Sequence, residues 1–209
     1  MKHFSLLHLP KNSLFLLKKQ METDILIQGD VMKNEKIKKI AVAAVFLSIG
    51  LVLPLLTGQI PEIGQRLLPL HIPVFLCSLI CGWQYGAVCG FTLPILRSLI
   101  FGMPELYPSA FSMAIELPAY AIICGLIYLC FKNKNLVAIY VSLVSAMLGG
   151  RVVYAIVQAF ILGLGEDGFT LTLFITKAFV NPFPGIILQL VIIPTIVFAL
   201  NKLKLRQIK

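Results

Sequence analysis

Charged side chains are scarce in this sequence. Asp, Glu, Lys and Arg make up 13% of the residues, against about 25% in a typical soluble domain. Hydrophobic residues reach 58%, and the mean hydropathy is +0.92. This balance excludes an ordinary soluble domain and a disordered chain. Apolar runs recur at about the 20-residue length of a helix that crosses a bilayer, so the sequence predicts an integral membrane protein with several spans.

Motifs for catalysis and metal binding are also lacking. The chain has neither a Gly-x-x-x-x-Gly-Lys-Ser/Thr phosphate loop nor a His-Glu-x-x-His or Gly-x-Ser-x-Gly pattern. Two of the 3 histidines, His3 and His8, lie close to the N-terminus. The 5 cysteines lie in apolar stretches without a Cys-x-x-Cys pair, and we interpret them as small hydrophobic residues in helices. We therefore predict no enzymatic activity, no cofactor and no metal site.

Residues 1–31 differ in composition from the rest of the chain. They mix scattered apolar residues with charges, and the apolar run at 13–17 is too short for the core of a signal peptide. Met32 then opens the basic segment Met-Lys-Asn-Glu-Lys-Ile-Lys-Lys, which is typical of a cytoplasmic start of a membrane protein. We interpret residues 1–31 as a disordered extension or a wrongly assigned start, and residues 32–209 as the membrane domain.

Six apolar segments are long enough to predict an all-α, six-transmembrane-helix bundle. The last apolar stretch is interrupted by Asn-Pro-Phe-Pro-Gly at residues 181–185, so we expect a short helix or re-entrant piece there before the final span. The predicted spans are about 37–56, 68–82, 84–101, 107–131, 136–164, and from about 184 to 200.

Basic residues predict the orientation of these spans. The N-terminal flank, the loop after the fourth span and the C-terminal tail together carry ten Lys and Arg residues, whereas Arg66 is alone on the other side. The positive-inside rule therefore places both the N- and C-termini in the cytoplasm. The net charge of +9 is then matched by an anionic membrane face, and we predict no nucleic-acid binding.

Four ionisable residues lie inside apolar segments, where each charge costs about 2.5–3.5 kcal/mol at the centre of a helix. They are Arg97, Glu116, Arg151 and Lys177, and all map to the outer half of the membrane. Arg97 and Glu116 have opposite charge on adjacent helices, so they could neutralise each other. Arg151 and Lys177 would then lack a protein anion in this layer, which favours an anionic ligand. The alternative for Lys177 is snorkelling to the outer headgroups.

One face of the fifth span carries polar side chains. Arg151, Tyr154 and Gln158 follow each other at spacings of three and four residues, so they share this face. Such a face suits the wall of a ligand pocket, with hydrogen bonds between helices as the alternative. We expect Arg151 and Lys177 to bind ligand charge, Tyr154 and Gln158 to orient the ligand, and two further residues to contribute as secondary pocket groups, namely Glu116 and Asn181.

Two further groups of candidate residues rest on weaker sequence signals. His71 lies between two prolines at the start of the second span, where it could contact a ligand or cap the helix, and the cap is our preferred interpretation. In the first span, Ala41, Ala44 and Ser48 are spaced three and four residues apart. Small residues at this spacing let another helix approach closely, in this chain or in a partner.

Five stretches of the chain resemble the substrate-binding S components of bacterial energy-coupling-factor (ECF) vitamin transporters, in the branch that includes pantothenate carriers. The resemblance covers roughly residues 33–202. The stretches are Leu-Pro-Leu-His-Ile-Pro-Val-Phe-Leu-Cys from residue 68, Leu-Pro-Ile-Leu-Arg-Ser-Leu-Ile-Phe-Gly-Met-Pro from 93, Tyr-Pro-Ser-Ala-Phe-Ser-Met-Ala-Ile-Glu from 107, Leu-Gly-Gly-Arg-Val-Val from 148, and Pro-Gly-Ile-Ile-Leu-Gln-Leu from 184.

The resemblance implies a protein of the bacterial cell membrane with six helices and one outward-facing pocket, built by the loop after the first helix and by helices four to six. It implies a transmembrane T subunit and two ATPase subunits as partners, and toppling of the S component as the mechanism. In this family the first helix docks on the T subunit through small residues. Ala41, Ala44 and Ser48 occupy the matching place, but Ser48 departs from the Ala-x-x-x-Ala pattern.

The preferred hypothesis is therefore a non-enzymatic subunit for the uptake of a small, polar, partly anionic vitamin or precursor. Pantothenate fits two outer cations and a polar helix face, while riboflavin, folate and other precursors stay open. A stand-alone secondary transporter of a small organic anion is the alternative, and it predicts uptake without ATPases and a polar path through both leaflets. A membrane enzyme is a third class, for which the sequence offers no nucleophile and base.

Overall fold

The computed structural model describes most of the chain between residues 34 and 202. The described residues are 34–57, 64, 66–162, 172, 175–176 and 180–202. The chain divides into two compact units, Met1–Lys38 and Lys39–Lys209, and the second unit forms the helical bundle. The predicted extension at residues 1–31 lies outside the described residues.

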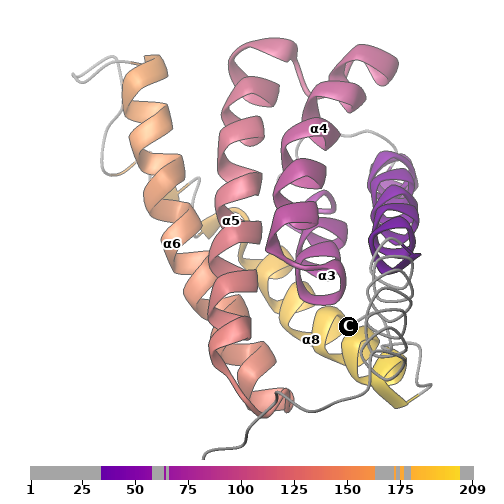
Figure 1. Ribbon diagram of the computed structural model, residues 1–209. Coiled ribbons are helices and arrows are strands. Elements are labelled where there is room, and N and C mark those ends of the chain that lie inside the picture. Colours follow the sequence, from indigo (N-terminus) through magenta and orange to yellow (C-terminus); the bar gives the residue numbers. More distant parts are fainter. Residues whose placement is uncertain are drawn as a thin grey trace, which may run out of the picture. The chain divides into compact units, whose positions relative to one another are not determined.

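All secondary structure in the described part is helical (Figure 1). Four of the helices are long and apolar enough to cross a membrane, namely Asn34–Leu55, Leu106–Cys130, Leu136–Ile161 and Phe183–Leu200. The labelled elements are η2 (Leu53–Thr57), α3 (His71–Cys81), α4 (Trp83–Phe101), η3 (Leu106–Ala110), α5 (Phe111–Cys130), α6 (Leu136–Leu162) and α8 (Phe183–Lys202).

The helices follow the predicted spans closely, with one exception in length. The described residues agree with the all-α prediction, but α3 has only 11 residues, which is about 16 Å of helix. Leu68 before it has a positive φ of 48°, so the helix begins three residues later than predicted. A helix of this length is shorter than the hydrocarbon layer of about 30 Å. Six spans and cytoplasmic termini therefore stay predictions.

A single glycine separates α3 from α4. Gly82 has φ 111°, a conformation that residues with a Cβ rarely adopt, and its N–H donates to the carbonyl of Ser78 at 3.1 Å. The chain reverses at this point, so α3 and α4 pack against each other. This tight reversal explains why two apolar segments with almost no intervening residues form two helices.

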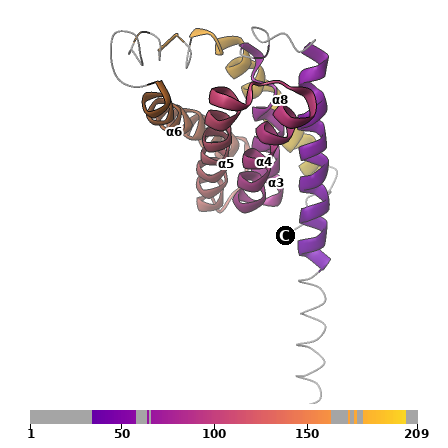
Figure 2. The ribbon, with the colours of Figure 1, turned by 90° about the horizontal axis from the view of Figure 1, so that it is seen from above.

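Helix α5 lies at the centre of the described bundle. It packs against α3, α4 and α6, and the view from above places it between α6 and the α3–α4 pair (Figure 2). Close approach to α4 depends on Gly90, since a Cβ there would lie 2.9 Å from the carbonyl carbon of Leu117. The site residues of α5 therefore have helices on both sides.

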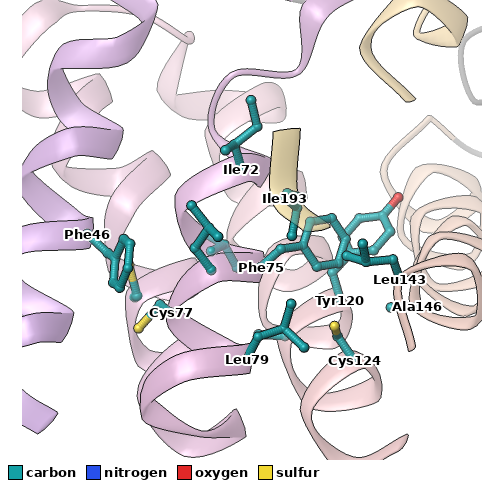
Figure 3. Packing of buried hydrophobic residues seen from close by; sticks show 14 of the residues in the cluster. Phe46, Ile72, Phe75, Cys77, Leu79, Tyr120, Cys124, Leu143, Ala146 and Ile193 are labelled. Carbon is teal, nitrogen blue, oxygen red and sulfur yellow. The ribbon is translucent and has the colours of Figure 1, made fainter. Parts of the chain in front are cut away.

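The core draws side chains from the first helix and from α3, α4, α5, α6 and α8, and Figure 3 shows part of it. Phe75 from α3, Tyr120 from α5, Leu143 from α6 and Ile193 from α8 are all buried in one cluster, together with Phe46 from the first helix. Large hydrophobic side chains are also exposed along the first helix, α4, α5, α6 and α8. An outer surface of this kind suits lipid rather than water.

Candidate functional site

Three of the four ionisable residues predicted inside the membrane are buried in the structure. Arg97 is 3% exposed, Glu116 3% and Arg151 6%, although they come from three different helices. Burying a charge is costly unless hydrogen bonds or an opposite charge compensate it, so their partners define the chemistry of the layer. The fourth residue, Lys177, lies outside the described residues.

Arg97 does not pair with Glu116, the possibility that their opposite charges left open. Arg97 points toward the end of the first helix, where its Nη1 donates to the carbonyl of Leu51 at 2.8 Å. The guanidinium carbon also lies 5.2 Å from the centre of the Phe101 ring. A carbonyl near the C-terminal end of a helix is a favourable partner for a cation, so Arg97 is accommodated without a carboxylate.

Glu116 instead pairs with Arg151 across the contact between α5 and α6. Its Oε1 lies 3.3 Å from Nη1 of Arg151, and the same oxygen accepts the hydroxyl of Tyr120 at 2.9 Å. The guanidinium carbon of Arg151 lies 5.9 Å from the centre of the Tyr120 ring. Glu116 and Tyr120 are four residues apart on α5, which places both on the face toward Arg151.

A glycine on α6 makes this arrangement possible. Gly150 precedes Arg151, and a Cβ at residue 150 would collide with the ring of Tyr120. The ring therefore rests directly against the backbone of α6, and the next residue on α6 carries the guanidinium beside it. Small residues at contacts between membrane helices allow this kind of close approach.

Arg151 is consequently not the unpaired cation that we expected from the sequence. Glu116 supplies a protein anion in the same layer, and two ionised groups of opposite sign leave no net charge. A guanidinium has five N–H donors, however, and within the described residues only Nη1 of Arg151 makes a hydrogen bond. Donors for a carboxylate or carbonyl oxygen of a ligand thus stay available in this part of the chain.

A second polar link joins the same two helices. Nε2 of Gln158 donates to Oγ of Ser112 at 3.2 Å, two turns along α6 from Arg151 and one turn along α5 from Glu116. Tyr154 lies between the two links on α6 and is half-buried. The polar face of the fifth span therefore forms hydrogen bonds between helices, the alternative that the sequence left open.

The side chain of His71 lies beside Tyr120 and has no hydrogen bond within the described residues. It is 2% exposed, and neither Nδ1 nor Nε2 has a hydrogen-bond partner in the described part of the chain. Its ring meets that of Tyr120 edge to face, with the ring centres 5.1 Å apart. The preferred sequence interpretation, a helix cap, is wrong, because α3 has no side-chain cap and only the backbone N–H of His71 bonds to the carbonyl of Leu68.

Two buried polar residues of this region were not predicted from the sequence. A third residue, which was predicted, lies in the turn before α8. Tyr120 was overlooked, although its position four residues after a buried acid was a usable signal. Gln189 was also overlooked; it is buried in α8, and its Nε2 approaches the carbonyl of Leu68 at 3.5 Å. Asn181, which was predicted, is half-buried in the turn before α8 and bonds through its backbone N–H to the carbonyl of Thr176 at 2.9 Å.

The small residues of the first helix lie on its surface. Ala41, Ala44 and Ser48 are all exposed, and the hydroxyl of Ser48 donates to the carbonyl of Ala44 at 2.9 Å. The hydroxyl is thus bonded to its own helix, which leaves a smooth strip of small groups. Such a strip is available to another helix.

These observations define a membrane protein that is helical in its described part, with a buried polar cluster where α3, α5 and α6 meet. A comparison with protein families matches residues 38–200 to the family described as ECF transporter, substrate-specific component, and the chain belongs to this family. Comparisons with curated proteins and with solved structures found no match. The family is a transporter component and not an enzyme class, and it implies a small-molecule substrate, a T subunit and ATPase partners in general.

Proposed function

We propose that this chain is the subunit that captures a small water-soluble vitamin or vitamin precursor at the outer side of a bacterial cell membrane, with pantothenate as the first candidate. In this proposal, six helices span the membrane, both termini are cytoplasmic, and two ATPases acting through a T subunit supply the energy. The observation that carries the proposal is the buried guanidinium of Arg151, which Glu116 and Tyr120 hold in place while most of its donors lack partners among the described residues.

The chemistry of the cluster suits a ligand with a carboxylate or carbonyl group. Arg151 presents a planar set of donors, which matches the two oxygens of a carboxylate, and a low-dielectric surrounding strengthens that contact. Because Glu116 already balances the charge, the ligand is bound by directed hydrogen bonds as much as by net attraction. Pantothenate carries a carboxylate, an amide and two hydroxyls, so it offers groups for the donors and acceptors of the α5–α6 contact.

The other predicted ligand residues have distinct parts in this proposal. Tyr154 and Gln158 orient the ligand from α6, on the same face as Arg151. Asn181 contributes a polar side chain from the turn before α8, and Lys177 supplies a second cation. The polar groups gather where α5 and α6 meet, which fits a subunit that captures a ligand better than a secondary transporter with a continuous path.

Binding to the partner subunits is assigned to the first helix. Ala41, Ala44 and Ser48 form an exposed strip of small residues, and we propose that a helix of the T subunit packs there. Uptake by vesicles that contain the chain alone, compared with vesicles that also contain the T and ATPase subunits, separates this function from that of a stand-alone transporter. Accumulation of ligand by the chain alone would contradict the proposal.

The ligand proposal is tested by replacing Arg151 in the purified protein. We expect Arg151→Gln to weaken pantothenate binding at least 100-fold in calorimetric titration, because a buried ligand carboxylate loses its charged donor. Arg97→Gln is the matched control: it removes the other buried guanidinium of the described bundle, which binds Leu51 rather than the cluster, and affinity should stay within about twofold. Equal affinity in Arg151→Gln and the wild type would refute the role of Arg151.

A native mass spectrum of the purified protein tests the identity of the ligand independently. The mass of a co-purified small molecule names its chemical class before any candidate is added. A molecule without a carboxylate or carbonyl group would contradict the ligand chemistry proposed for Arg151.

A further inference from the structure

Within the described residues, the imidazole of His71 lacks hydrogen bonds in a place where its polar neighbours have them. Neither ring nitrogen has a partner in this part of the chain, and the side chain is buried. Tyr120, Glu116 and Arg151 are linked by hydrogen bonds in the same layer. A buried polar group without a partner is costly, and native proteins rarely keep one without a reason. The position of His71 therefore needs an explanation other than stability.

His71 faces the polar cluster through the ring of Tyr120. The centre of its ring lies 5.1 Å from that of Tyr120, and the guanidinium carbon of Arg151 lies 5.9 Å from the same ring. His71 comes from α3, whereas Arg151 comes from α6. The two side chains thus approach a single aromatic ring from different helices.

We propose that His71 is a ligand-binding residue that forms its hydrogen bonds only when the substrate is bound. The proposal rests on the function proposed above and adds α3 to the helices that contact the ligand. A buried imidazole without a carboxylate partner is neutral, so it offers one N–H donor and one nitrogen acceptor. The donor takes an acceptor of the ligand, and the other nitrogen takes a hydroxyl or amide hydrogen.

The hydrogen-bonding requirements of Arg151 and His71 together narrow the class of substrate. Arg151 requires an acceptor such as a carboxylate or carbonyl oxygen, while His71 requires a neighbouring group that both donates and accepts. A hydroxyl next to a carbonyl meets both requirements, and so does a hydroxy amide. An aromatic or purely aliphatic acid would leave the acceptor nitrogen of His71 without a partner and would bind weakly.

Both nitrogens are closed off from the surface, so the ligand reaches them only after side chains rearrange. Rearrangement of side chains on binding is common, and the energy lost in the free state through the unpaired imidazole is regained when the ligand supplies the bonds. The unbound protein therefore keeps a small local instability that substrate binding removes.

The test compares His71→Phe and His71→Gln with the wild type in detergent. Phenylalanine keeps an aromatic edge against Tyr120 but removes both nitrogens, so the unbound protein should melt at the same temperature or higher. A structural role for the imidazole predicts the opposite, and a fall in melting temperature of more than about 5 °C would overturn the proposal. This part of the test needs no ligand, so it stands whether or not pantothenate is the substrate.

The second part measures binding of pantothenate and of its analogue without the hydroxyl next to the amide carbonyl. The wild type should lose at least 10-fold in affinity for the analogue, and His71→Phe should bind both compounds equally weakly, whereas His71→Gln should recover part of the difference. Unchanged affinity of His71→Phe for pantothenate would overturn the inference. Failure of the wild type to bind pantothenate would instead reject the proposed ligand, and the melting temperatures would still show whether the imidazole has a structural role.

Discussion

Replacing Glu116 by glutamine should destabilise the protein and strengthen its binding of anions at the same time. The carboxylate lies 3.3 Å from the Arg151 guanidinium. At an effective dielectric constant of about 20, two unit charges at this separation attract by about 5 kcal/mol. Removing one member of a buried ion pair typically costs about 3–5 kcal/mol, since the other charge stays buried without compensation. Glutamine keeps an oxygen for the hydroxyl of Tyr120, so the change isolates the charge.

Thermal unfolding in detergent measures this effect. The chain has 1 tryptophan, Trp83, which packs against Gly125 of α5 and whose fluorescence reports the separation of α4 from α5. Glu116→Gln should lower the melting temperature strongly, while a double variant, Glu116→Leu with Arg151→Met, should recover most of the loss because no charge is left buried. If the double variant instead loses as much stability as the Glu116 and Arg151 substitutions do separately in sum, the ion pair is not the source of the effect.

The same substitution should change ligand binding in the opposite direction. Without the carboxylate of Glu116, the Arg151 cation lacks its compensating charge. The carboxylate of a bound ligand then supplies this charge. The rise in melting temperature on adding saturating pantothenate should therefore be larger in Glu116→Gln than in the wild type, since ligand that binds only the folded state stabilises it more as its affinity rises. An equal or smaller rise would show that the ligand does not contact the guanidinium.

Two further predictions concern helix contacts, and the first has a matched control. Gly150→Ala should displace the ring of Tyr120 and cost about 1–3 kcal/mol as well as ligand affinity, whereas Gly149→Ala meets only the flexible end of Ile123 and should be neutral or mildly stabilising; equal melting temperatures would contradict the assignment. Ala44→Trp places a large ring on the exposed strip of the first helix, so it should abolish co-purification with the T subunit while ligand binding stays unchanged, and intact co-purification would move the docking surface elsewhere.

The helices could be predicted from the sequence because the bilayer imposes a strong length requirement on apolar segments. Glycines also mark some of the boundaries, since Gly82 separates α3 from α4 and Gly102 follows α4. The short length of α3 was not predictable in the same way. Hydropathy counts Leu68, Pro69 and Leu70 as part of the apolar run, but the positive φ of Leu68 and the turn at the next two residues delay the start of the helix.

The buried charges could also be located from the sequence, but their partners could not. Depth along a helix placed Arg97, Glu116 and Arg151 in one layer, and depth alone does not show which neighbour an acid faces. Helix α5 packs against both α4 and α6, so Glu116 had two possible basic partners. The close approach of α6 at Gly150 and the hydrogen bond of Arg97 to the first helix decide between them. Both depend on packing that no single helix pattern contains.

Tyr120 connects the polar cluster to the hydrophobic core, and this connection has a consequence for ligand binding. Its hydroxyl bonds to Glu116, and its ring contacts His71. The centre of this ring also lies 5.7 Å from that of Phe75, and Figure 3 shows both rings in the core. Interiors are close-packed, so a shift of this ring must be taken up by the side chains around it. A ligand that draws Arg151 or Glu116 toward itself therefore acts on α3 through Tyr120 as well as on α5 and α6. Affinity and stability are consequently coupled in every variant of this cluster, which is why each substitution has to be measured in both the unbound and the bound protein.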